Sequence, residues 1–157
     1  MLLGAAVTET TAEFLGSWAD GLLTVSGKPD QVRKVVEAFR RGSGEGKPLF
    51  MQVGLNWAPT EEETLQGAYE QWRTNVLGGE VNWELRSPGD FDTAARYVRP
   101  EDMRESLLIS ADLDRHVQWL GAYIELGFEE FQLHQVARNQ RAFIEAFGAR
   151  VLPQLRG

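Results

Sequence analysis

Residues 49–63 read LFMQVGLNWAPTEEE, and this stretch decides the fold. Apolar side chains occupy the odd positions from Leu49 to Leu55, whereas Gln52 and Asn56 fall on even positions. Successive side chains of a β-strand point to opposite faces, so the alternation predicts a strand with one apolar face. Thr60 followed by Glu63 has the spacing of a helix-capping box. A strand that leads through a short turn into a helix is the repeating unit of a parallel α/β protein.

The same unit recurs along the chain. Strands are expected at residues 2–7, 22–25, 49–57 and 128–136, each followed by a helix. Between the third and fourth units, residues 78–88 are expected to be irregular, two short helices are expected at 91–98 and 100–107, and Asp112 is expected to cap a longer helix. Alternation without hairpin turns predicts parallel strands joined by right-handed crossovers. Two closures stay open: a small doubly wound sheet, or part of a (β/α)8 barrel, which takes about 250 residues.

Composition limits the classes of protein. The chain has 157 residues, 43% of them hydrophobic and 25% charged, which predicts one globular domain over residues 1–157. A formal charge of −7 argues against a nucleic-acid-binding surface. The apolar runs are far shorter than the roughly 20 residues of a membrane span, and Met1 is not followed by a basic leader, so we expect a soluble, cytoplasmic protein. The absence of cysteine excludes disulfides, a thiol nucleophile and cysteine-ligated metal.

Motifs for metal or phosphate chemistry are weak. The glycine-rich loop at residues 42–47 precedes a strand rather than a helix, and Pro48 replaces the Ser or Thr of a P-loop. The two histidines, His116 and His134, lie far apart in sequence and have no carboxylate spacing typical of zinc. The sequence therefore predicts no metal site, and it leaves the catalytic residues unknown.

Polar residues gather where the predicted strands end, which is where parallel α/β proteins bind ligands. Thr8, Thr10 and Thr11 combine hydroxyl groups with the N–H groups of a starting helix, an arrangement that suits a phosphate monoester. The alternative is an ordinary threonine cap. Lys28, on the turn from Ser26, either reaches an anionic ligand or is a surface lysine.

The second face of the predicted sheet carries Gln52 and Asn56 on one strand and Gln132 and His134 on another. Buried polar groups must be paired or line a cavity, so these residues form either a satisfied polar layer or a pocket wall. His134, nearest the strand end, is the best candidate to contact a ligand. Trp57, at a strand end, is the candidate for ligand stacking. The other aromatic candidates are expected to be packing residues on helices: Trp18, Trp72 and Trp119.

Three segments carry a resemblance to a known family: residues 17–24 (SWADGLLT), residues 112–116 (DLDRH) followed by 126–128 (LGF), and residues 133–140 (LHQVARNQ). They resemble the C-terminal half of the luciferase-like oxidoreductases, TIM-barrel enzymes that use FMN or the deazaflavin coenzyme F420. The similarity is greater to the branch that contains the F420-dependent glucose-6-phosphate dehydrogenases and the non-F420 flavin oxidoreductases. It extends from Leu2 to Leu155.

The resemblance implies a fold of four strands from a TIM barrel and a set of binding residues. In that family the turn after the fifth strand binds the cofactor phosphate, which here falls on Val7 and Thr8, with Thr10 and Thr11 near by. The turn Ser26-Gly27-Lys28 matches the one whose lysine holds the sugar phosphate. The candidate substrate contacts are therefore Ser26, Lys28, Asn56, Trp57 and His134.

The resemblance also sets limits on function. The other two basic residues of the sugar-phosphate clamp align with Asn82 and Ser106, so a small organic substrate other than glucose 6-phosphate is expected. The family's catalytic histidine and glutamate lie on the first four strands, which have no counterpart here.

An arc of parallel strands exposes two edges and its inner face, so we expect either a homo-oligomer or a missing N-terminal half. Two functions stay open. The first is part of a flavin- or F420-dependent oxidoreductase that transfers hydride between the cofactor and a small organic substrate. The second is a non-catalytic, self-associating half-barrel that binds a phosphate-bearing ligand or none.

Overall fold

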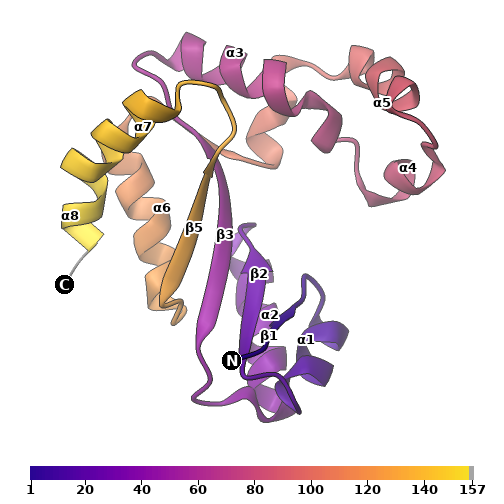
Figure 1. The fold of residues 1–157 in the computed structure, drawn as a ribbon, viewed down its shortest axis with the longest axis vertical. Helices are drawn as coiled ribbons and strands as arrows, with labels where there is room; N and C mark the ends of the chain where they lie inside the picture. The colour runs from indigo at the N-terminus through magenta and orange to yellow at the C-terminus, as the bar shows by residue number, and fades with distance from the viewer. Residues whose placement is uncertain (156–157) are drawn as a thin grey trace. The chain divides into compact units, whose positions relative to one another are not determined.

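The computed structural model describes residues 1–155, in which strands and helices alternate (Figure 1). The strands are β1 (Leu3–Ala5), β2 (Gly21–Val25), β3 (Leu49–Asn56), β4 (Leu108–Ile109) and β5 (Glu130–Gln135). The α-helices are α1 (Glu9–Gly16), α2 (Pro29–Phe39), α3 (Glu61–Trp72), α4 (Gly79–Glu84), α5 (Pro88–Ala94), α6 (Leu113–Glu125), α7 (Gln140–Ala146) and α8 (Leu152–Leu155). Shorter helical turns are η1 (Arg40–Gly44), η2 (Arg73–Asn75), η3 (Ala95–Tyr97), η4 (Pro100–Glu105) and η5 (Phe147–Val151).

The strands form a five-stranded sheet in the order β1-β2-β3-β4, and β5 also pairs with β3. The pairs β1–β2, β2–β3 and β3–β4 are parallel, with Leu3 opposite Gly21 and Leu22 opposite Leu49. The predicted parallel β/α fold is therefore confirmed. The two-residue strand β4 is additional to the four expected strands, because a strand of two residues has no alternation that a sequence pattern can show.

Two compact units make up the described chain. Unit 1 comprises residues 1–54 and 117–134, and unit 2 comprises residues 55–116 and 135–155. The single domain over residues 1–157 stays a prediction.

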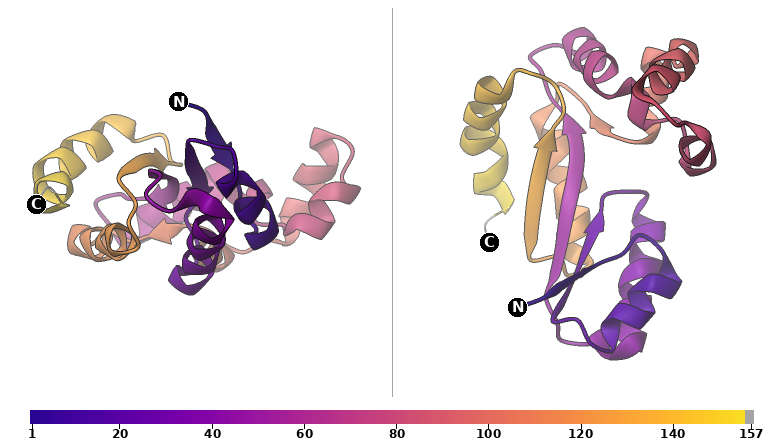
Figure 2. Two further views of the ribbon diagram at one scale, coloured as in Figure 1. Left: turned by 90° about the horizontal axis from the view of Figure 1, so that it is seen from below. Right: turned by 45° about the vertical axis from the view of Figure 1, so that its right-hand side comes forward.

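The core of unit 1 follows from the alternation along β3. Leu49, Met51 and Val53 are at most 3% exposed, whereas Gln52 between them is exposed. Figure 2 shows α1 and α2 side by side along β1 and β2. The face of α2 that the sequence predicts as apolar is buried as expected: Val32, Val35, Val36 and Phe39.

Helices α1 and α2 lie close together because two glycines allow it. A Cβ at Gly16 would lie closer than 3.0 Å to the Phe39 carbonyl oxygen, and a Cβ at Gly42 would lie as close to the Glu13 carbonyl oxygen. A glycine often ends a helix, but here the helical turns continue past Gly42 through η1 to Gly44. The reversal comes one residue later, at Ser43, whose φ is +81°.

In unit 2, helix α3 begins after Thr60, the predicted cap. The Glu63 N–H donates to Thr60 Oγ1 at 3.2 Å, and α3 packs its apolar face into a buried cluster. The cluster consists of Ala68, Met103, Leu107, Ile109 and Val136. His116 is also buried in this unit, where its Nε2 lies 2.9 Å from the Ser110 carbonyl oxygen and burial lowers the pKa of its imidazole. The predicted cap of α6 is confirmed, because the Asp114 N–H donates to Asp112 Oδ1 at 2.9 Å.

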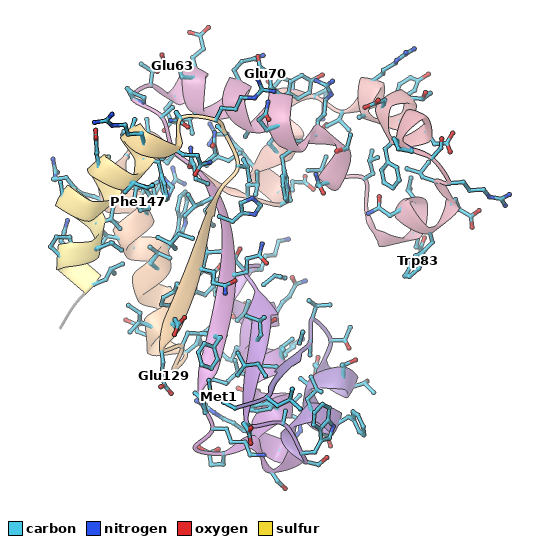
Figure 3. The ribbon with its side chains drawn as sticks, in the orientation of Figure 1. Met1, Glu63, Glu70, Trp83, Glu129 and Phe147 are labelled. Carbon is cyan, nitrogen blue, oxygen red and sulfur yellow. The ribbon has the colours of Figure 1, made fainter. Side chains whose placement is uncertain are left out.

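The region between α3 and β4 differs most from expectation. Residues 79–84, expected to be irregular, form α4, whose Trp83 is 89% exposed (Figure 3). A short helix that buries so little apolar surface lacks the repeat of apolar residues every three to four positions by which longer helices are predicted. The next helix begins at Pro88 rather than at residue 91, because Ser87 and Asp90 form a capping box.

One expected packing residue is largely exposed. Trp18, which follows α1, is 49% exposed. Its ring lies edge-on to the ring of Phe14, with the two centroids 6.1 Å apart. Within residues 1–155, no helix combines the length and the apolar character that crossing a bilayer requires.

Candidate functional site

The turn between β1 and α1 has the geometry of a threonine cap. Thr8 has extended backbone angles, and its Oγ1 accepts the Thr11 N–H at 3.4 Å. The Thr8 hydroxyl donates in turn to Thr11 Oγ1 at 3.0 Å. The first intrahelical bond runs from the Ala12 N–H to the Thr8 carbonyl, so the N–H groups of Glu9 and Thr10 precede the helical ladder. This end of α1 therefore presents two hydroxyl groups and two N–H groups.

The charge at this turn is mixed. Glu9 lies in the first turn of α1, where a carboxylate complements the helix dipole. Arg41 approaches it, with Nη2 4.0 Å from Glu9 Oε2 and 3.5 Å from Glu13 Oε2. Val7, which precedes the cap, is 65% exposed.

The turn after β2 is tied down on both sides. Ser26 donates its N–H to the Gln52 carbonyl at 2.9 Å, and its Oγ accepts the Gly54 N–H at 3.1 Å. The Tyr123 hydroxyl, from α6, donates to the Gly27 carbonyl at 2.7 Å, and burial raises the pKa of this phenol. Lys28 follows as the exposed N-cap residue of α2. The backbone of the turn is therefore fixed while the lysine side chain faces solvent.

On the sheet face of unit 1, Gln52 and His134 meet. Gln52 Nε2 lies 3.3 Å from His134 Nδ1, so β3 and β5 are bridged by side chains at this level. Gln52 is exposed and His134 is half-buried, which places the pair at an accessible part of the face. Unit 1 thus contains seven of the nine predicted site residues: Val7, Thr8, Thr10, Thr11, Ser26, Lys28 and His134.

The other two predicted residues, Asn56 and Trp57, lie in unit 2 at the end of β3. Asn56 is fully buried: its Oδ1 accepts the Ala137 N–H at 3.0 Å, and its Nδ2 donates to the Thr64 carbonyl at 2.6 Å. For Asn56, the structure therefore has the satisfied polar layer that was one of the two alternatives. Trp57 is half-buried, and its indole N–H donates to the Ala111 carbonyl at 3.0 Å.

Sequence reasoning missed three residues that hold these turns: Tyr123 in unit 1, and Gln135 and Asn139 in unit 2. The Gln135 amide bonds the Trp57 backbone at both its N–H and its carbonyl, at 2.9 and 2.8 Å, and Asn139 Nδ2 donates to the same carbonyl at 2.9 Å. One signal was available, since Asn56 and Gln135 are polar residues at the ends of two predicted strands. Tyr123 gives no such signal, because its helical position is that of a core residue.

Glu61 fixes the loop that supplies the Ala111 carbonyl. Its Oε1 accepts the Ala111 N–H at 2.7 Å and the Ser110 hydroxyl at 2.9 Å, while Oε2 lies 3.1 Å from Arg104 Nη2. The Ala111 N–H contributes most to lowering the pKa of this carboxyl, and Arg104 and Ser110 lower it further against the opposing effect of partial burial. Within the described residues, no group of three or more histidines and carboxylates is placed to hold a metal ion.

Comparison with known proteins gives a family context. No protein-family model matches the chain. The chain is 26% identical over 149 residues to the F420-dependent glucose-6-phosphate dehydrogenase of Microbacterium testaceum, which covers 90% of this chain and 44% of that protein. It is 24% identical over 160 residues to the enzyme of the same name from Mycobacterium tuberculosis, which covers 97% of this chain and 47% of that protein. The chain is homologous to F420-dependent oxidoreductases.

Solved structures have the same fold. An F420-dependent secondary alcohol dehydrogenase in complex with an F420-acetone adduct matches with a TM-score of 0.82 and 17% identity, over 99% of this chain and 48% of that one. The coenzyme F420-dependent tetrahydromethanopterin reductase of Methanopyrus kandleri matches with a TM-score of 0.75 and 20% identity, over 98% of this chain and 50% of that one.

A more distant match binds FMN. It is the oxygenating constituent of 3,6-diketocamphane monooxygenase from Pseudomonas putida, in complex with FMN, with a TM-score of 0.55 and 12% identity over 97% of this chain and 47% of that one. The predicted resemblance to luciferase-like TIM-barrel oxidoreductases is confirmed. The chain spans about half the length of the relatives that it matches.

Proposed function

We propose that this chain forms the cofactor-phosphate-binding and substrate-facing part of an F420- or FMN-dependent oxidoreductase, which transfers hydride between the cofactor and a small organic substrate. The observation that carries the proposal is the sequence match to F420-dependent enzymes over 97% of the chain. The FMN complex among the fold neighbours keeps FMN as the second candidate. The bound cofactor would supply the hydride chemistry, and the protein would supply its position.

The turn after β1 supports the phosphate-binding part of this proposal. A phosphate monoester needs several hydrogen-bond donors and a positive potential, and helix N-termini provide both. The exposed Thr11 hydroxyl adds a donor to the N–H groups of Glu9 and Thr10, and the Thr8 hydroxyl donates to it within the cap. Arg41 lies opposite the Glu9 carboxylate. The residues present therefore fit the phosphate of FMN or F420, with Val7, Thr8, Thr10 and Thr11 as the contacts.

The substrate side is supported by the positions beyond β2, β3 and β5. In unit 1, Lys28 stands exposed on a turn that Ser26 and Tyr123 hold in place, and His134 lies near the end of β5. In unit 2, Trp57 follows the end of β3. The exposed side chains of Asn82 and Ser106 carry no charge to complete a sugar-phosphate clamp. We therefore propose a small organic substrate other than glucose 6-phosphate.

Completion of the enzyme requires further strands. The relatives are about twice as long, and unit 1 exposes apolar side chains: Val25, at the end of β2, is 47% exposed, and Leu2, just before β1, is 61% exposed. Exposed apolar surface beside the edge strand β1 favours burial against another protein surface. We propose that a second copy of the chain or a separate N-terminal half supplies it.

Titration with FMN, F420 and riboflavin tests the proposal. Riboflavin lacks the phosphate of FMN, so the capped turn predicts that it binds at least tenfold more weakly than FMN. Absorbance and fluorescence report binding, and size-exclusion chromatography on the same samples reports self-association. A protein that binds neither FMN nor F420 would instead be the non-catalytic half-barrel.

A further inference from the structure

A side chain of β5 continues the strand pairing past the end of β3. β5 ends at Gln135, and its side-chain amide then takes the place of a backbone partner for Trp57. Gln135 Oε1 accepts the Trp57 N–H at 2.9 Å, and Gln135 Nε2 donates to the Trp57 carbonyl at 2.8 Å. A primary amide presents its oxygen and one of its two N–H groups on the same side, so it can bond both the N–H and the carbonyl of one residue, as a facing residue does in a sheet.

The arrangement is reciprocal. Asn56, the last residue of β3, uses its amide in the same way on the turn after β5, where its Oδ1 accepts the Ala137 N–H at 3.0 Å. Its Nδ2 donates to the Thr64 carbonyl in α3 at 2.6 Å. Gln135 is 3% exposed and Asn56 is fully buried, so neither amide has water as an alternative partner. Each strand thus fixes the turn that follows the other.

Trp57 is consequently held at three points. Its N–H and carbonyl bond Gln135, Asn139 adds a second donor to the carbonyl, and its indole N–H donates to the Ala111 carbonyl. The loop that carries Ala111 is itself anchored by Glu61. Because its indole N–H is committed to the protein, Trp57 has no side-chain donor left to offer a ligand, and only its apolar ring remains for contact.

We propose that Gln135 is a positioning residue that holds Trp57 as a preformed apolar wall of the substrate site. The inference rests on the proposed function, because that function puts the substrate beyond the strand ends. It also defines the ligand: an uncharged organic group with a flat or apolar face stacks on such a wall, whereas a phosphate gains nothing from it. Asn139 supports the same carbonyl of Trp57 and shares the role of Gln135.

Amide hydrogen exchange and ¹⁵N NMR test the positioning. In Gln135→Leu, the backbone N–H of Trp57 loses its acceptor, so its hydrogen-exchange rate should rise at least tenfold. The indole N–H of Trp57 should give a broadened or split signal in place of a single one. The amide of Ala68, inside α3, should keep its protection and report that unit 2 is folded. Gln132→Leu changes an exposed glutamine of the same strand and should leave Trp57 unchanged.

The variant Gln135→Glu gives a signature that loss of packing does not produce. An ionised glutamate would place an acceptor against the Trp57 carbonyl and Asn139 Oδ1, whereas a protonated one restores the donor. Protection of the Trp57 amide, corrected for the intrinsic rate, should therefore recover as the pH falls through the pKa of the new carboxyl. An undisturbed Trp57 in Gln135→Leu, or no recovery in Gln135→Glu, would overturn the inference.

Titration with cyclohexanone, an uncharged ring, tests the ligand wall separately. The Trp57 indole signal of the natural sequence should shift with cyclohexanone and stay in place with inorganic phosphate, and the shift should shrink at least threefold in Gln135→Leu. No shift with cyclohexanone, or an equal shift with phosphate, would overturn the role of the wall. If FMN and F420 also fail to bind while Trp57 loses its order in Gln135→Leu, the proposed function fails and the positioning by Gln135 stands.

Discussion

Gln52 Nε2 lies 3.3 Å from His134 Nδ1, so an amide of β3 faces the imidazole of β5 across the inner surface of unit 1. The nitrogen of a glutamine amide is only a donor, so this contact is a hydrogen bond in the tautomer whose Nδ1 is unprotonated. The partner of one ring nitrogen thus influences which nitrogen carries the proton. Gln52 accordingly favours the Nε2–H tautomer of His134.

The first prediction concerns this tautomer. In ¹⁵N NMR at a pH where His134 is neutral, we expect the Nε2–H form to dominate in the natural sequence and the population of the Nδ1–H form to rise in Gln52→Leu. Gln31→Leu, an exposed position on α2, provides the control and should leave the spectrum of His134 unchanged. A dominant Nδ1–H form in the natural sequence would show that the amide has the opposite orientation.

The second prediction concerns the Thr8 cap. Thr8→Ala removes the acceptor of the Thr11 N–H and should lower the free energy of unfolding by about 1 kcal/mol, whereas Thr8→Ser should stay within a few tenths of the natural value. Thr8→Ala combined with Thr11→Ala should also weaken FMN binding toward the affinity of riboflavin. Urea denaturation and FMN titration measure the two effects. If the double variant bound FMN with the affinity of the natural sequence, the cofactor phosphate would not bind at this turn.

The third prediction compares two glycines of unit 1. Gly42→Ala forces a Cβ against the Glu13 carbonyl oxygen and should destabilise the protein by about 2 kcal/mol or more. Gly121, inside α6, has space for a Cβ among the described residues, so Gly121→Ala should stabilise by about 0.5–1 kcal/mol through helix propensity. Thermal and urea unfolding of both variants measure the contrast. Similar stability for the two variants would mean that α1 and η1 do not approach so closely in solution.

The fourth prediction follows from the lowered pKa of Glu61, whose ordinary value is 4.5. A carboxyl with a lower pKa in the folded state stabilises the protein above its unfolded pKa, and this contribution disappears as the pH falls through the folded pKa. The stability of the natural sequence should therefore decline below about pH 4.5 more steeply than that of Glu61→Gln. Because Glu61 is 53% exposed, the difference should not exceed about 1 kcal/mol. Parallel unfolding curves at every pH would exclude this contribution.

Most of the sheet can be predicted from the sequence because the alternation of apolar and polar residues determines which face of a strand is buried. In β3, three buried apolar residues alternate with more exposed ones: Leu49, Met51 and Val53. Only one register of the strand buries all three. Thr8, Thr60 and Asp112 mark helix starts through local hydrogen bonds, which short-range sequence contains. The exposed helix α4 and the two-residue strand β4 have too little periodic burial to be recognised.

The candidate site is harder to predict because its hydrogen bonds depend on strand register. Ser26 bonds the Gly54 N–H, and Gln135 bonds Trp57 at a separation of 78 residues. Neither pairing follows from the residue type, since a serine and a glutamine at a strand end are equally compatible with solvent exposure. Asn56 illustrates the difference: the sequence places it on the inner face, and only the register reveals that Ala137 and Thr64 occupy its amide.

The serine hydroxyl that bonds the Gly54 N–H has a consequence for how the turn after β2 tolerates substitution. The alternating apolar residues determine the strand register, whereas three hydrogen bonds hold the turn, and the serine hydroxyl makes only one of them. Replacing Ser26 by alanine would remove that one bond and leave the backbone pairing of β2 with β3 in place. Such a turn can therefore change its mobility by single substitutions while the surrounding sheet stays unaltered.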